Sequence, residues 1–131
     1  MHHTFDAIQA FAAAYTEAWC SGDPAAVASH YAPDGQIIIN GGEPHKGTEA
    51  MTAMAAAFHA AYPGLRVICD DVRTNGTHAL YAWTLEGTHG ESGSFVRLKG
   101  WEEWELTDDL KVASSLGWFD AEDEARQIAG G

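Results

Sequence analysis

The sequence predicts an α+β fold in which N-terminal helices pack on a long, curved antiparallel sheet. In three segments of the first 62 residues, apolar side chains recur at steps of three and four, the period of an amphipathic helix. From residue 65 onward the period changes to two, and short turns separate the apolar runs, as in an antiparallel meander. Helices followed by strands in this way are typical of the α+β class.

The first helix is predicted to begin at Phe5 and to end near Cys20. Thr4 can cap its start, and Gly22 suits the left-handed position that follows many helices. Residues at helical spacing give it one apolar face: Phe5, Ile8, Ala12, Tyr15 and Trp19.

A short second helix is expected after Asp23, a good N-cap, because Pro24 is tolerated in the first turn. It should carry Val27 and Tyr31 inward and stop at the turn signal of residues 33–35. The β-branched run that follows predicts the next element, a strand over residues 36–40, ended by two glycines.

A third helix is predicted from residue 47 to about 62, with Met51, Met54, Ala55 and Phe58 on its buried face. The strongest hairpin signal is Asn75-Gly76, and a second tight turn is expected at residues 108–109. The remaining elements are four strands over residues 65–73, 78–87, 94–106 and 110–120, and a closing helix over residues 121–129.

Composition fits one domain spanning residues 1–131. The chain has 131 residues, of which 46% are hydrophobic, which is enough to form an apolar core. Seven Lys and Arg stand against 19 Asp and Glu, so the net charge is −12. This balance argues against a protein that follows nucleic-acid phosphates, and equally against one that binds an anionic membrane surface.

Cysteine and histidine usage predicts a cytoplasmic protein without a metal or other cofactor. Cys20 and Cys69 form no CxxC pair, and the N-terminus lacks the apolar run of a signal peptide. The seven histidines show no ligand spacing such as HExxH.

Several short segments, in this order, resemble the nuclear transport factor two-like superfamily, whose domains have a cone-shaped, cystatin-like fold. They are WCSGD at 19–23, HYAPD at 30–34, GTEA at 47–50 and YPGL at 62–65. Within this superfamily, WTLEGTHG at 83–90, Gly100 and WFD at 118–120 are similar to the SnoaL-like polyketide cyclase branch. The resemblance spans residues 5–129, and it implies the fold more specifically than any activity, because the fold hosts enzymes and binding modules alike.

Asp120 is the first candidate for a catalytic group. Burial near Trp118 would favour its neutral form and allow general acid or base chemistry. The resemblance implies the same role, since SnoaL-like cyclases have their acid/base aspartate at this position. However, that branch pairs the aspartate with a histidine on the preceding strand, and residues 94–106 contain none. Alternatively, Asp120 caps the final helix. The prediction of burial rests on the parity that Asp120 shares with Leu110, Val112, Leu116 and Trp118.

Glu102 is the second candidate, because strict alternation places it among apolar neighbours on its strand. A charge there is costly unless it is paired or functional. Gly100 could instead introduce a β-bulge, which would turn Glu102 to solvent and Glu103 inward. The sequence leaves these two orientations open.

His89 and Tyr15 are further candidates beside a predicted cavity. His89 lies between glycines, either at the cavity rim or as a hydrogen-bonded surface residue. Tyr15 corresponds to an oxyanion-hole tyrosine of the related ketosteroid isomerases, but Ile39 stands where those enzymes have their base. Tyr15 can equally be a core aromatic.

Aromatic residues are predicted to line this cavity and to suit a ring-containing ligand. The expected ligand contacts are Tyr15, Trp19, Tyr31, Phe58, Trp83, Glu102, Trp104 and Trp118. Aromatics on the outer face of the sheet would instead form a homodimer interface, which is common in the superfamily.

Together these features predict a protein that binds a small, largely apolar or polyketide-like molecule. It could be a cofactor-free cyclase or isomerase in which Asp120 and His89 act on the substrate. The alternative is a non-catalytic ligand-binding or dimeric assembly module of the same fold.

Overall fold

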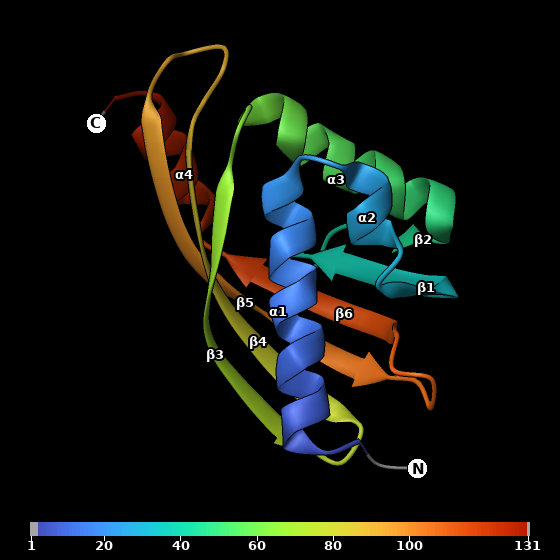
Figure 1. Ribbon diagram of the computed structural model, residues 1–131. Helices are drawn as coiled ribbons and strands as arrows, with labels where there is room; N and C mark the ends of the chain where they lie inside the picture. The colour runs from blue at the N-terminus through green and yellow to red at the C-terminus, as the bar shows by residue number, and fades with distance from the viewer. Residues whose placement is uncertain (1–2, 131) are drawn as a thin grey trace.

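The computed structural model describes residues 3–130, and it confirms the predicted α+β class. In Figure 1 the helices of the N-terminal half lie on one side of a strongly curved sheet, and a further helix lies near the C-terminus. The helices are α1 (Phe5–Ser21), α2 (Pro24–Ala28), α3 (Thr48–Ala61) and α4 (Ala121–Ile128). The strands are β1 (Tyr31–Ile39), β2 (His45–Lys46), β3 (Arg66–Asn75), β4 (His78–Thr88), β5 (Phe95–Leu106) and β6 (Val112–Phe119).

The sheet is mixed rather than wholly antiparallel, which corrects the sequence prediction. Its strand order is β2-β1-β6-β5-β4-β3. The four C-terminal strands form the predicted antiparallel meander. In contrast, β1 pairs parallel with β6, and β2, which the sequence did not indicate, pairs antiparallel with β1. The N-terminal strand therefore enters the sheet beside the last strand of the chain.

The first helix has the predicted ends. The side chain of Thr4 accepts a hydrogen bond from the backbone N–H of Ala7 at 3.1 Å, and Gly22 adopts a φ of 75°. Tyr15 and Trp19 are buried on the predicted face, whereas Phe5 is exposed. This face packs α1 across the sheet (Figure 1).

The second helix ends earlier than predicted, at Ala28. Tyr31 is buried, but it begins β1 instead of lying on the helix. The turn signal of residues 33–35 lies inside this strand, where the pairing with β6 shifts between Tyr31 and Gln36. A Cβ atom on Gly35 would lie 2.7 Å from the carbonyl oxygen of Val112. The glycine thus permits a close approach of β6 and marks a strand irregularity rather than a turn.

The last strand changes parity, which the sequence did not reveal. Leu106 pairs with Val112, but Glu105 pairs with Ser114, so β6 contains one extra residue. Val112 is buried, whereas Leu116 is 38% exposed on the outer face. The prediction that these two residues share the apolar face is therefore wrong. Leu110, predicted in the same strand, lies in the preceding turn with a φ of 57°.

None of the helices in residues 3–130 is both long and apolar enough to cross a membrane.

Candidate functional site

A cavity of about 60 Å³ lies among α1, α3 and the inner face of the sheet. Its aliphatic walls include Ile39, Leu85 and Leu98. Six aromatic residues complete the lining: Trp19, Phe58, Tyr81, Trp83, Trp118 and Phe119. Apolar walls with few polar groups are typical of small-molecule sites.

Glu102 is the only carboxyl group among the described residues that line this cavity. It is 6% exposed, while Glu103 is exposed on the other face of β5. The alternation holds because β5 pairs without a shift around Gly100; the irregularity falls later, between Glu105 and Leu106. The structure thus places Glu102, and not Glu103, inside.

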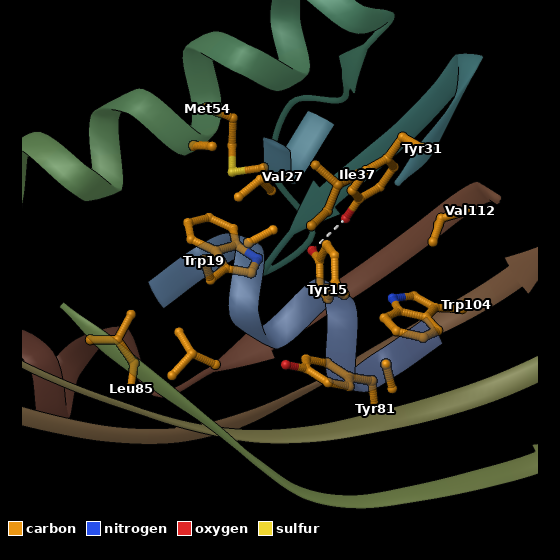
Figure 2. Close-up of a cluster of buried hydrophobic side chains, with 14 of the residues drawn as sticks. Tyr15, Trp19, Val27, Tyr31, Ile37, Met54, Tyr81, Leu85, Trp104 and Val112 are labelled. Carbon is orange, nitrogen blue, oxygen red and sulfur yellow. Dashed lines mark hydrogen bonds between the residues drawn. The ribbon is translucent and has the colours of Figure 1, made fainter. Parts of the chain in front are cut away.

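Four neutral donors from four elements surround the Glu102 carboxyl group. On Oε1, Trp104 Nε1–H donates at 2.8 Å and Ser115 Oγ–H donates at 2.8 Å. The Tyr15 hydroxyl donates to Oε2 at 3.0 Å, and the Tyr31 hydroxyl donates to Oε1 at 3.2 Å. The two tyrosine hydroxyls are also 2.9 Å apart, as the dashed line in Figure 2 shows. These donors orient the carboxyl group.

Burial raises the pKa of the Glu102 carboxyl, because desolvation penalises the ionised form. The hydrogen bonds from Trp104, Ser115, Tyr15 and Tyr31 oppose this effect only in part. Burial and the Glu102 charge raise the pKa values of Tyr15 and Tyr31 as well, so both hydroxyls stay protonated. A carboxyl group with a raised pKa next to an apolar cavity is a candidate for proton transfer to or from a bound ligand.

Aromatic packing holds this group of side chains in place. Trp104 stacks on Tyr81 with ring centroids 5.0 Å apart and an interplanar angle of 12°. The Tyr15 ring meets both at 5.4 Å, edge to face. Figure 2 shows the Tyr15, Tyr81 and Trp104 rings close together, with Trp19 further along α1. Their packing restricts the rotamers of the donors around Glu102.

The predicted ligand contacts fall into two groups. Trp19, Phe58, Trp83 and Trp118 line the cavity, as does Glu102. The others lie behind the carboxyl group and donate to it: Tyr15, Tyr31 and Trp104.

Neither predicted catalytic group lines the cavity. Asp120 is exposed, and its carboxylate accepts a hydrogen bond from the backbone N–H of Asp123 at 3.0 Å, which caps α4. The parity change in β6 removes it from the apolar face where the sequence placed it. His89 lies in the loop after β4, where its Nδ1 is 2.8 Å from the Ser92 hydroxyl. Asp120 therefore has the alternative role of a helix cap, and His89 that of a hydrogen-bonded loop residue.

Sequence reasoning missed Ser115, which is fully buried and donates to Glu102. Strict alternation from Val112 turns Ser115 outward, and only the extra residue in β6 brings it inside. No group of three or more acidic, His or Cys side chains in residues 3–130 could hold a metal ion.

Comparisons with known proteins place this site in a familiar fold. A family model described as a SnoaL-like domain matches residues 12–114. No match was found among curated proteins. Several hundred solved structures are similar, and three of them are described below.

A protein from Catenulispora acidiphila with a ketosteroid isomerase-like fold, crystallised with trimethylamine, has a TM-score of 0.84 and 16% identity over 91% of this chain and 92% of its own. A proposed SnoaL-like polyketide cyclase from Jannaschia sp. CCS1 has a TM-score of 0.78 and 18% identity. The match covers 93% of this chain and 94% of that protein. The third is SalBIII, an epoxide hydrolase/cyclase-like enzyme with a role in pyran ring formation in the polyether salinomycin. It has a TM-score of 0.80 and 16% identity, and the match covers 90% of this chain and 94% of that protein. At these identities the similarities establish the fold. The match of the family model over most of the chain shows that this protein belongs to the SnoaL-like domain family.

Proposed function

We propose that this protein binds a small, largely apolar, aromatic or polyketide-like molecule in the cavity and that Glu102 acts on it as a cofactor-free general acid or base. The observation that carries the proposal is a buried carboxyl group, fixed by four donors, in an otherwise apolar cavity. Such a group is costly to bury, and proteins retain it mostly where it performs chemistry or binds a ligand.

Proton transfer at an activated carbon is the reaction that this geometry supports best. Glu102 would remove a proton from a carbon next to a carbonyl group and return it elsewhere on the same molecule, as in an isomerisation or an aldol-type cyclisation. All four donors already point at Glu102, which leaves none of them for a substrate oxyanion. The substrate should therefore be acidic at carbon by itself, as β-dicarbonyl units of polyketide chains are.

The relatives support this proposal by analogy. The Catenulispora protein holds a small molecule, trimethylamine, and SalBIII is named for ring formation in a polyether. The present cavity is apolar enough to favour a similar class of ligand.

Deuterium exchange tests the acid/base role. Benzoylacetone, an aromatic β-diketone, would be incubated in D₂O, and its exchange at the central carbon would be followed by NMR. Glu102→Gln is expected to lower the protein-catalysed rate about 10²- to 10⁴-fold. Glu103→Gln and Asp120→Asn, which change exposed carboxylates, should exchange at the wild-type rate. Equal rates for Glu102→Gln and wild type would overturn the catalytic role.

A non-catalytic binding module is the second candidate. It is favoured because all four donors are used by Glu102 and because Ile39, at the cavity wall, stands where the related ketosteroid isomerases have their base. In that case benzoylacetone should quench tryptophan fluorescence in both wild type and Glu102→Gln without exchange. Val67→Phe, which fills the cavity, should abolish the quenching. A substitution of Ala82 would not fill the cavity. Ala82 pairs with Trp101 on the outer face of the sheet and is not among the described residues that line the cavity.

We also propose a cytoplasmic homodimer formed through the outer face of β5 and β6. On this face Trp101 is 43% exposed and Leu116 is 38% exposed. Exposed apolar side chains grouped on a sheet face are typical of an interface. The two cysteines are free, as expected in a reducing compartment.

A further inference from the structure

We infer that the ligand of this cavity is a small organic cation, an alkyl- or arylammonium compound, with Glu102 as its counter-ion and aromatic rings around its apolar groups. The inference rests on the proposed binding function and adds the charge of the ligand to it. It follows from three observations: the charge of the site, the arrangement of its aromatic rings and the use of its donors.

The site holds an acidic group with no cationic partner. None of the residues described as lining the cavity is Lys, Arg or His. Every side chain that donates to Glu102 is neutral: Tyr15, Tyr31, Trp104 and Ser115. An ionised carboxylate buried without a counter-charge is unfavourable, and a bound cation offsets that cost.

Aromatic residues line the cavity on both the helices and the sheet. Trp19 and Phe58 form one pair across α1 and α3, with ring centroids 5.9 Å apart and an interplanar angle of 83°. Trp83 and Phe119 form another on β4 and β6, with centroids 6.2 Å apart. The negative faces of such rings attract ammonium groups, and tryptophan does so most strongly. Rings on several walls are therefore suited to an alkylated nitrogen.

The donors around Glu102 do not favour an anionic ligand. The donors that surround Glu102 are directed at its own oxygen atoms and are not available to a ligand: Tyr15, Tyr31, Trp104 and Ser115. The Tyr81 hydroxyl lies 2.5 Å from Thr16 Oγ1 and is likewise paired. A net charge of −12 also attracts cations toward the molecule.

A matched pair of probes tests the inference. Choline carries a trimethylammonium group, and 3,3-dimethylbutan-1-ol is its neutral carbon isostere, so the two differ chiefly in charge. Binding of each would be measured by calorimetry and by quenching of tryptophan fluorescence. Wild type is expected to bind choline at least about tenfold more tightly than the isostere, and Glu102→Gln should bind the two equally.

Two controls separate the cavity from the bulk charge of the protein. Glu103→Gln removes one charge from the same strand on the opposite face and should keep the preference for choline. In 0.5 M NaCl a preference that comes from bulk charge is screened, whereas a buried pair with Glu102 persists. The wild-type comparison at high salt remains decisive even if Glu102→Gln does not fold.

The outcomes distinguish this inference from the proposed function. Equal or tighter binding of the isostere, or loss of the preference at high salt, overturns the cationic ligand and leaves an apolar binding site. Binding of neither probe overturns the cationic ligand, while the benzoylacetone measurements test the proposed function separately. Probe binding that Val67→Phe leaves unchanged lies outside the cavity and also overturns the cationic ligand.

Discussion

Glu102 combines two properties that rarely coexist in a folded chain, deep burial and a titratable carboxyl group. Its neighbours satisfy its oxygen atoms but do not neutralise its charge. The folded state therefore carries a desolvation cost whenever this group is ionised. That cost makes the protonation of Glu102 measurable through stability.

We expect the pH dependence of stability to report this cost. Because burial raises the folded-state pKa of Glu102, its proton-linked contribution to stability is fully present below the unfolded-state pKa of about 4.3. That contribution is lost as the pH rises through the folded-state pKa. The free energy of unfolding of wild type, relative to Glu102→Gln, should fall across this window in urea titrations. A constant difference between wild type and Glu102→Gln across this pH range would contradict the raised pKa.

Asp120 provides a second prediction at the scale of single residues. Asp120→Ala removes the side-chain cap of α4 and should lower the free energy of unfolding by about 1 kcal/mol. Asp120→Asn preserves the capping oxygen and should leave stability close to wild type. Thermal unfolding followed by circular dichroism checks both variants. Equal destabilisation by the two would contradict the capping role.

The sequence predicted Glu102 as a candidate but could not choose between it and Glu103. Alternation along β5 is visible in the residue pattern, while the position of a bulge depends on pairing with a partner strand. The same limit explains Asp120 and Ser115, whose orientations depend on the extra residue in β6. The sequence therefore identified the candidate side chains from the pattern of a single strand. It could not predict their orientation where that depends on how two strands pair.

At the scale of elements, the sequence predicted best those helix ends that are set by neighbouring residues in the chain. Thr4 and Gly22 fixed both ends of α1, because a cap acts on its own helix. The Pro33-Asp34-Gly35 segment resembled a turn but lies in β1, because pairing with β6 extends that strand through it. Tertiary pairing overrode the local preference there.

Gly100 on β5 gives a prediction for the sheet. A Cβ atom at this position would lie 2.5 Å from the Trp83 ring and 2.3 Å from the carbonyl oxygen of Trp118. Gly100→Ala should therefore displace Trp83 from the cavity wall, change tryptophan fluorescence and lower stability by about 1–3 kcal/mol.

Gly117→Ala is the matched control, because a Cβ atom there would meet its neighbours at 3.6 Å or more. Chemical unfolding should show a clearly smaller loss for this variant than for Gly100→Ala. If the two losses were equal, the close approach of Trp83 to Gly100 would not be what excludes a side chain.

At the scale of the whole molecule, the α+β class and the antiparallel meander were predictable from the sequence, but the pairing of the N-terminal strand β1 with β6 was not. The change of period near residue 65 separated helices from strands, and short turns implied antiparallel neighbours. The parallel pairing of β1 with β6 joins segments far apart in the sequence, for which no local pattern exists. That pairing brings Tyr31 to Glu102 and so completes the site.

The outer face of the sheet carries the prediction for assembly. Leu116→Glu places a charge beside Trp101 and should convert the proposed dimer to a monomer in sedimentation velocity experiments. Phe5→Glu, at an exposed apolar position at the start of α1, should leave the oligomeric state unchanged. A monomeric wild-type protein would contradict the proposed interface.

Both the proposed function and the inferred cation require Glu102 to contact the ligand, and carbon-13 NMR of its carboxyl group measures this directly. In protein labelled at the glutamate carboxyl carbon, the Glu102 signal is the one that disappears in Glu102→Gln. We expect it to titrate above the range of ordinary glutamates and to shift in proportion to occupancy when choline or benzoylacetone is added, while the Glu103 signal stays unchanged. An ordinary titration midpoint, with no shift at saturating concentrations of either compound, would contradict the assignment of the site to Glu102.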